Sequence, residues 1–211
     1  MSGSFSRRDV LRMCTAFGAL TLAMPLPVEA ALDLIQAAED RGSSPTPTTV
    51  MGPFFKKSAP RTAVLRTASD PGLPLSVKGR VSDVRGDSLN GAMIEVWQAD
   101  HFGRYDIEGY RYRATLVAGR VGEYEFESVM PGHYPDRVAQ HVHYLVRAPG
   151  HKPLVTQLYF ATDQIFEGNP AKNFHRDPLV PSMDVVRPVV LTGNPQAPQV
   201  SVVFDLCLER I

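Results

Sequence analysis

The 211-residue sequence predicts an all-β protein, an antiparallel β-sandwich of about seven to eight strands with long loops. From about residue 74, short runs of alternating apolar and polar residues follow one another, and Gly, Pro, Asn or Asp stands between most of them. The 18 prolines and 16 glycines are scattered rather than repeated. No long helical pattern interrupts the runs, which favours strands over a helical bundle.

Each expected strand is a short run bounded by turn residues. The first, LSVKGRVSDV at 75–84, precedes the turn signal Asn90-Gly91, and MIEVWQA at 93–99 follows it. Trp97 in this second strand is expected to be a core anchor of the sandwich. Further strands with the same pattern are expected at 113–118, 123–129, 140–148, 154–162, 185–192 and 199–208.

The N-terminus, residues 1–30, has the order of features found in a cleavable export signal. Arg7-Arg8 forms a basic head, the apolar stretch 13–26 is too short to span a bilayer, and VEAA at 28–31 provides small residues for cleavage. The arginine pair resembles a twin-arginine signal. The prediction is export to a periplasmic or extracellular location, without membrane attachment after cleavage. A short buried or anchoring helix is the alternative.

The rest of the chain divides at residue 50. Residues 31–50 are expected to form a short helix that fades into a Ser/Thr/Pro linker, and residues 51–211 the β-sandwich domain. Cleavage near Ala30 leaves Cys207 as the single cysteine, so no intramolecular disulfide can form. The 22 basic and 22 acidic residues balance, which predicts no nucleic-acid surface. Exposed apolar edges of such sandwiches often associate, so a homo-oligomer is compatible with the sequence.

A His-x-His pattern, QHVHYL at 140–145, lies inside one expected strand. Side chains alternate along a strand, so His141 and His143 should share one face while Val142 and Tyr144 share the other. Two neighbouring imidazoles can bind one metal ion, whereas burying them without a partner costs desolvation. A pair of surface histidines on a solvated edge is the alternative for this motif taken alone.

Tyrosines beside glycine or strand ends strengthen the metal hypothesis. They occur in WQADHFGRYD at 97–106 and MPGHYPDR at 130–137. Phenolate is a hard, strongly donating ligand that selects a trivalent ion over zinc. Two phenolates and one hydroxide would balance a charge of 3+, so two histidines and two tyrosines would form a self-consistent ferric site.

These motifs together resemble the intradiol ring-cleavage dioxygenases, the family that includes protocatechuate 3,4-dioxygenase and catechol 1,2-dioxygenase. The resemblance runs through the segments 46–55, 77–106, 122–137 and 140–163, in the family's order. It implies Fe(3+) as cofactor and Tyr105, Tyr134, His141 and His143 as metal ligands. It also implies that the long loops are active-site loops and that Gln157 is a glutamine beside the substrate.

The resemblance further implies the reaction. A catechol and O2 are the expected substrates, and the ring opens between its two hydroxylated carbons to give a muconate-type diacid. Tyr134 is expected to be displaced by the catechol and to accept one of its protons, while Gln157 and Arg137 orient the ring. The family commonly has an arginine three residues before the first ligand histidine; here Val138 stands there and Arg137 precedes it. Asp136 replaces an aromatic residue of some protocatechuate enzymes, and residues 31–50 are too few for the helical segment of catechol-cleaving relatives.

Three other protein classes share parts of this pattern. A non-catalytic, transthyretin-like β-sandwich binding module would have the strands but no reason to keep two tyrosines with the His-x-His pair. A cupin metalloenzyme would need a glutamate a few residues after His143, where Leu145, Val146 and Arg147 stand. An extradiol dioxygenase would need a carboxylate beside two histidines around Fe²⁺.

Overall fold

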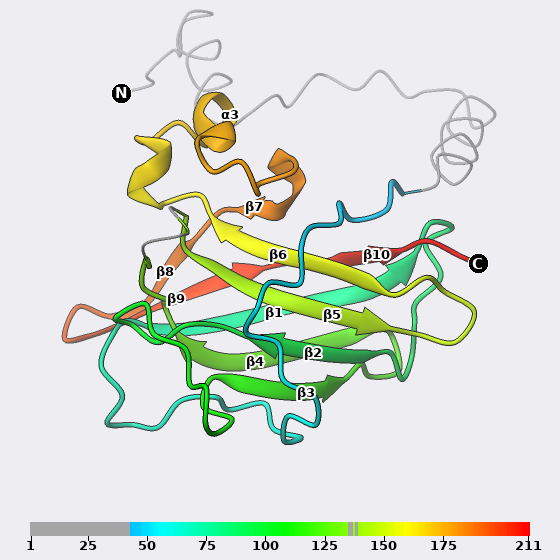
Figure 1. Ribbon diagram of the computed structural model, residues 1–211, viewed down its shortest axis with the longest axis horizontal. Helices are drawn as coiled ribbons and strands as arrows, with labels where there is room; N and C mark the ends of the chain where they lie inside the picture. Colours follow the sequence, from blue (N-terminus) through cyan, green and yellow to red (C-terminus); the bar gives the residue numbers. More distant parts are fainter. Residues whose placement is uncertain (1–42, 135–136, 138) are drawn as a thin grey trace, which may run out of the picture. The chain divides into compact units, whose positions relative to one another are not determined.

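The computed structural model describes residues 43–134, 137 and 139–211. The predicted export signal, residues 1–30, lies outside them. Within the described residues, ten strands form two five-stranded sheets (Figure 1). The first sheet contains β1 (Pro74–Asp83), β4 (Glu123–Val129), β8 (Val190–Asn194), β9 (Ala197–Val203) and β10 (Leu206–Leu208). The second contains β2 (Met93–Trp97), β3 (Arg113–Val117), β5 (His141–Arg147), β6 (Leu154–Phe160) and β7 (Val186–Arg187).

The all-β sandwich is confirmed, but the purely antiparallel pairing is wrong. β1 pairs in parallel with both β9 and β10, and β6 pairs in parallel with β7. The remaining pairs are antiparallel. Hydrophobic alternation specifies which face of a strand is buried but carries no information about the direction of its neighbours. The sequence pattern therefore predicted the layers and not the connections between them.

Two of the eight predicted strands are each divided into two, which accounts for the ten strands observed. Pro188 interrupts the run 185–192, because proline lacks the N–H that a sheet ladder needs, and β7 and β8 form on its two sides. The run 199–208 breaks at Phe204 and Asp205, where the Asp205 carboxylate accepts the Arg80 backbone N–H at 2.9 Å. Pairing with β1 resumes in the same register beyond the break.

The hydrophobic core lies between the sheets. Alternate residues of each strand point into it, as Val77 of β1, Phe126 of β4 and Val142 and Leu158 of the second sheet do, and none of the four is more than 1% exposed. Burying a side chain of this size stabilises the fold by about 1.5–3 kcal/mol. The opposite face of the second sheet is also covered, and the candidate site lies there.

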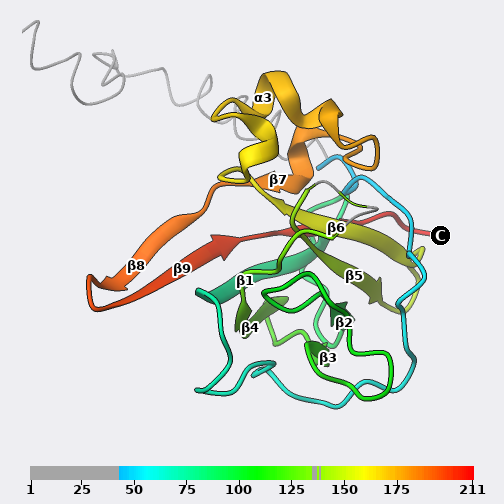
Figure 2. The same cartoon turned by 60° about the vertical axis from the view of Figure 1, so that its left-hand side comes forward.

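Short helices and an extended segment complete the described chain. Between β6 and β7 lie η1 (Gln164–Phe166), α3 (Pro170–Asn173), η2 (Phe174–Arg176) and η3 (Met183–Val185), above the sheets in Figure 1. The β8–β9 hairpin extends away from the other strands (Figure 2). Residues 43–50, predicted to belong to a linker, lie alongside β6. The Thr49 N–H donates to the carbonyl oxygen of Val155, and the Thr156 hydroxyl donates to that of Pro47. No helix in the described ranges is long and apolar enough to cross a bilayer.

Candidate metal centre

The register of the second sheet places four polar or aromatic residues in one row. Arg113 of β3 lies opposite Trp97 of β2, Trp97 lies opposite His143 of β5, and His143 lies opposite Gln157 of β6. Residues paired across neighbouring strands point to the same face of a sheet. All four side chains therefore lie on the face directed away from the sandwich core, and all four residues are buried.

The two histidines lie on this outer face, as alternation predicts. His141 lies opposite Tyr159, two positions along from the pair formed by His143 and Gln157. Val142 and Tyr144, the intervening residues, belong to the core between the sheets. The ring centroids of His141 and His143 are 4.8 Å apart. One strand thus contributes both to the core and to the candidate site.

Hydrogen bonding assigns the proton of the His141 ring. Nδ1 lies 2.7 Å from the carbonyl oxygen of Ala139, which can only accept, so Nδ1 carries the hydrogen and Nε2 has a free lone pair. Nε2 lies 3.3 Å from the hydroxyl of Tyr134. Burial lowers the pKa of His141 to about 4, and burial followed by the charge of a protonated His141 lowers that of His143 well below its usual range. Both rings are therefore neutral near pH 7, the form that binds metals.

The two predicted tyrosines approach the same point from different loops. Tyr105 lies between β2 and β3, and Tyr134 between β4 and β5. The ring centroids of the two tyrosines are 5.6 Å apart. The centroid of Tyr134 lies 5.6 Å from the ring centroid of His141, and the centroid of Tyr105 lies 6.2 Å from that of His143. The structure therefore brings together all four residues that the sequence indicated as ligands.

The phenols fit a trivalent cation. The Tyr105 hydroxyl is buried and has no hydrogen-bond partner among the described atoms. Burial, followed by the neighbouring Tyr134, raises the pKa of Tyr105, and burial raises that of Tyr134. Without a cation both phenols stay protonated at neutral pH, and a buried hydroxyl without a partner costs free energy. A strongly charged ion between them would deprotonate them and satisfy the free oxygen.

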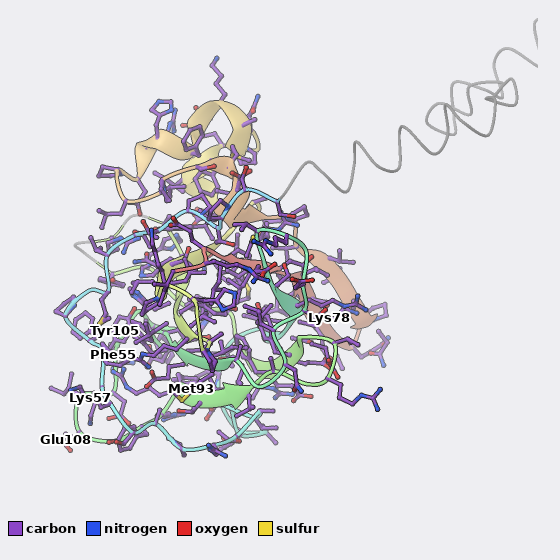
Figure 3. All side chains as sticks on the ribbon, turned by 90° about the vertical axis from the view of Figure 1, so that its right-hand side faces the viewer. Phe55, Lys57, Lys78, Met93, Tyr105 and Glu108 are labelled. Carbon is purple, nitrogen blue, oxygen red and sulfur yellow. The ribbon has the colours of Figure 1, made fainter. Side chains whose placement is uncertain are left out.

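An aromatic wall surrounds this point, and its composition corrects one prediction. Trp97 is buried but does not lie in the core between the sheets: its ring stacks on His143, with centroids 4.8 Å apart and an angle of 4°. Phe54 stacks on Tyr105 at 4.2 Å, and Phe55 packs against Trp97. Figure 3 shows Phe55 and Tyr105 near one another, on the opposite side from Lys78 of the first sheet. Strand alternation could have assigned Trp97 to the outer face, because it places Trp97 on the same side of β2 as Glu95 and opposite to the core residues Ile94 and Val96.

Gly52 makes the closest approach of the N-terminal segment to the histidines. Its φ of +73° is a left-handed conformation that favours glycine. A Cβ atom at this position would lie 3.2 Å from Cε1 of His143. The segment 52–55 therefore both covers the histidine and contributes Phe54 to the wall around Tyr105.

Arg137 and Gln157 meet beside the candidate ligands. Arg137 donates to the Gln157 side-chain oxygen and to the Tyr159 hydroxyl, both at 2.8 Å. Its Nε lies 3.5 Å from the Asp177 carboxylate, which also accepts the Ala139 N–H at 3.2 Å. Asp177 thus holds the residue whose carbonyl orients His141. Asp136 and Val138, the positions at which the sequence departs from the family pattern, lie outside the described residues.

Sequence reasoning missed Arg113, Tyr159 and Asp177. Arg113 and Tyr159 could have been found from strand alternation, because both fall on the outer face of the second sheet. Asp177 comes from the irregular segment before η3, and no local pattern connects it with Arg137, 40 positions earlier.

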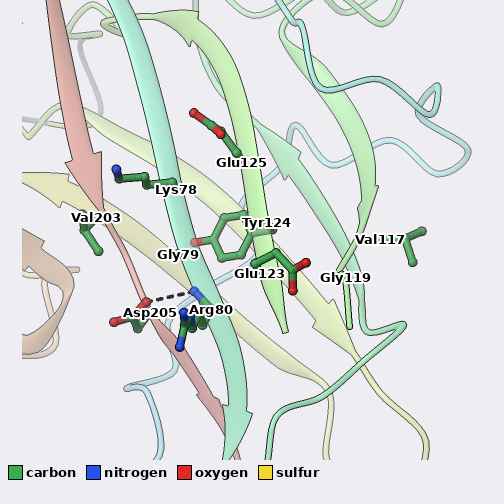
Figure 4. A pocket seen from close by; sticks show the side chains of 10 residues that line it. All are labelled: Lys78, Gly79, Arg80, Val117, Gly119, Glu123, Tyr124, Glu125, Val203 and Asp205. Carbon is green, nitrogen blue, oxygen red and sulfur yellow. Dashed lines mark hydrogen bonds between the residues drawn. The ribbon is translucent and has the colours of Figure 1, made fainter. Parts of the chain in front are cut away.

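A separate hollow of about 710 Å³ lies over β1 and β4 of the first sheet (Figure 4). Its charged side chains are of both signs, Lys78, Arg80, Glu123, Glu125 and Asp205. It contains none of the four candidate ligands. Size alone does not locate chemistry, so the convergence of phenols and imidazoles, not this hollow, defines the candidate site.

Fold and site together define a class: a β-sandwich that gathers two phenols and two imidazoles on the covered outer face of one sheet. Comparison with known proteins agrees. The family model described as "Dioxygenase" matches residues 50–209. The hydroxyquinol 1,2-dioxygenase of Nocardioides simplex is 30% identical over 71% of this chain and 61% of its own length. The catechol 1,2-dioxygenase of Acinetobacter baylyi is 27% identical over 85% of this chain and 68% of its own length.

Solved structures show the same likeness. The dioxygenase domain of a dioxygenase–carbohydrate-binding protein fusion from Streptomyces sp. SirexAA-E is 33% identical, with a TM-score of 0.69, over 80% of this chain and 100% of that one. Catechol 1,2-dioxygenase from Acinetobacter sp. ADP1 is 25% identical, with a TM-score of 0.68, over 98% of this chain and 79% of that one. The chain belongs to the intradiol ring-cleavage dioxygenase family.

Proposed function

We propose that the protein is a non-haem Fe(III) dioxygenase that cleaves a catechol-type ring with O2, between its two hydroxylated carbons, to give a muconate-type diacid. The convergence of Tyr105, Tyr134, His141 and His143 carries this proposal. The names of the relatives, catechol and hydroxyquinol 1,2-dioxygenases, support the type of reaction.

The four side chains are suited to holding a ferric ion. Two neutral imidazoles and two phenolates contribute a charge of −2, so one hydroxide would complete neutrality around Fe³⁺ and make its burial tolerable. When bound there, Fe³⁺ would supply a Lewis-acidic centre that a catechol can chelate through its two oxygens and that activates the ring toward O2. Zn²⁺ with the same four side chains and a hydroxide would carry a net charge of −1, and its preferred nitrogen and sulfur ligands are only half represented here.

Tyr134 is the tyrosine we assign to proton transfer. Its hydroxyl lies 3.3 Å from Nε2 of His141, and its pKa is raised by burial. Displaced from the metal by substrate, its phenolate would therefore be a strong base for a catechol proton. Tyr105, whose ring stacks on Phe54 with centroids 4.2 Å apart, is assigned to permanent ligation.

Arg137 and Gln157 are assigned to orienting the substrate ring. Arg137 is buried beside His141 and Tyr134, where its positive charge would stabilise negative charge that develops on the ring. Gln157 is fixed from two sides: its oxygen accepts from Arg137, and its amide donates to Val50 at 2.8 Å. A residue held in this way can present one defined geometry to a ligand.

Export is the second part of the proposal. The twin-arginine-type pattern at Arg7-Arg8 supports transport of a folded protein to the periplasm or the medium. Changing Arg7-Arg8 to Lys-Lys is expected to leave the protein in the cytoplasmic fraction. Equal periplasmic yields of this variant and the wild type would contradict the proposal.

The function is tested by loading purified protein with Fe³⁺ and following its visible absorption. Tyrosinate-to-iron charge transfer should give a red-brown protein, and addition of a catechol under nitrogen should shift the band. With O2, the ring-cleaved diacid should appear by ultraviolet absorption and mass spectrometry. Tyr134→Phe should lower the intensity of the charge-transfer band and slow turnover. Tyr124→Phe, in the other sheet, should leave both unchanged. A colourless iron-loaded protein without turnover would favour the non-catalytic binding module.

A further inference from the structure

Two buried arginines flank the candidate ligands, and they differ in how their charge is compensated. Arg137, on the Tyr134 side, has the carboxylate of Asp177 as its partner. Arg113, on the Tyr105 side, is 3% exposed and forms no ion pair with any carboxylate of the described residues. Burying an unpaired guanidinium is costly, so its retention calls for an explanation.

The hydrogen bonds of Arg113 join the two segments that enclose Tyr105. One guanidinium nitrogen donates to the carbonyl oxygen of Phe54, the residue that stacks on Tyr105. The other donates to the carbonyl oxygen of Asp106, the residue that follows Tyr105, at 3.1 Å. The guanidinium carbon lies 6.0 Å from the centre of the Tyr105 ring. Arg113 therefore holds Tyr105 through its chain neighbour and through its stacking partner at once.

Further hydrogen bonds connect the loop that carries Tyr105 on its other side. The Asp106 carboxylate accepts the N–H groups of Gly109 and Arg111 at 2.7 and 2.8 Å. Lys56 donates to the Glu108 and Gly109 carbonyls at 2.8 and 2.9 Å. These contacts shape the tip of the loop, whereas the bonds of Arg113 act at Tyr105 itself.

We propose that Arg113 is a positioning residue for Tyr105, which it clamps between the segment of Phe54 and the backbone of Asp106 and backs with a buried positive charge. This inference rests on the proposed function, because it treats Tyr105 as the permanent tyrosinate ligand. A tyrosinate is negatively charged, so a guanidinium behind it offsets part of the cost of burying it.

The test compares Arg113→Met, Arg113→Lys and a matched control, Arg147→Met, in the full iron-loaded protein. Arg147 also lies in the second sheet but pairs with Glu95 away from the site. Iron affinity is measured by competition with a chelator, the tyrosinate bands by resonance Raman, and kcat and KM with catechol. Arg113→Met is expected to bind iron about 10 to 100-fold more weakly. It should also lose intensity in one tyrosinate set, and lower kcat more than it changes KM.

Arg113→Lys should recover part of the affinity, because an ammonium keeps the charge and can reach one of the two carbonyls. Arg147→Met should match the wild type. Wild-type iron affinity and Raman bands in a folded Arg113→Met would overturn the proposal. If that variant does not fold, the same result in Arg113→Gln, which lacks the charge, would overturn it. A wild-type protein without any tyrosinate band would instead refute the proposed function.

Discussion

Gly52→Ala isolates the contact between the N-terminal segment and a candidate ligand. The added Cβ would lie 3.2 Å from Cε1 of His143, closer than ordinary van der Waals contact. The backbone of residue 52 has a φ of +73°, and a non-glycine residue in this left-handed region destabilises the fold by about 1–2 kcal/mol. Displacing the packed imidazole should cost about 1 kcal/mol more. We expect a total loss of about 2–3 kcal/mol in the free energy of unfolding.

Gly150→Ala is the matched control. Gly150 has a φ of +74°, and a Cβ at this position would meet no atom within 4 Å. Gly150→Ala should therefore carry only the cost of the left-handed backbone conformation. Urea unfolding of the metal-free proteins should therefore separate the two variants by about 1 kcal/mol. Iron affinity should fall about tenfold in Gly52→Ala and stay unchanged in Gly150→Ala. Equal stability and equal iron affinity in the two variants would refute the reasoning, because His143 would then not be constrained by Gly52.

Three further outcomes are expected. Asp177→Asn removes the counter-ion of buried Arg137 and should lower the free energy of unfolding by about 3 kcal/mol, measured with urea. A loss below about 0.5 kcal/mol, the size expected of an ordinary surface substitution, would contradict the pairing. In the metal-free protein, His141 should contribute about 3 kcal/mol to the loss of stability as the pH falls from about 6.5 to about 4, because burial lowers its pKa to about 4 and the unfolded chain takes up the proton first. The free energy of urea unfolding of His141→Gln should therefore fall by about that much less than that of the wild type over this range, and an equally steep fall in the two proteins would contradict this. Tyr124→Phe removes a buried hydrogen bond to the Phe204 carbonyl and should cost about 1 kcal/mol by thermal unfolding, and a changed kcat would contradict its separation from the site.

Local sequence pattern predicted the parts of the site that lie on strands. Period-two alternation places His141 and His143 on one face and Val142 and Tyr144 in the core, and the structure shows this division. The same pattern identified most strands, although Pro188 divided one of them. Strand existence and facing are local properties, so a single sequence can reveal them.

The tyrosines and the supporting residues required more than local pattern. Tyr105 and Tyr134 lie in loops, where no periodicity indicates direction, and only the family motifs pointed to them. Asp177 approaches Arg137 across 40 positions, through a segment of short helices. Parallel pairing of β1 with β9 and β10 likewise depends on long-range packing. These features depend on how strands, loops and short helices that are distant in sequence pack together, which composition and residue spacing do not specify.

The candidate site depends on strand register as strictly as the core does. The row Arg113, Trp97, His143 and Gln157 exists because four strands pair in one register. A slip of β5 by one residue would move both histidines into the core and expose Val142 and Tyr144 on the site face. It would bury two imidazoles without partners and remove two of the four candidate ligands together. The packing that stabilises the sandwich therefore also disfavours this slip, in which the site would be incomplete.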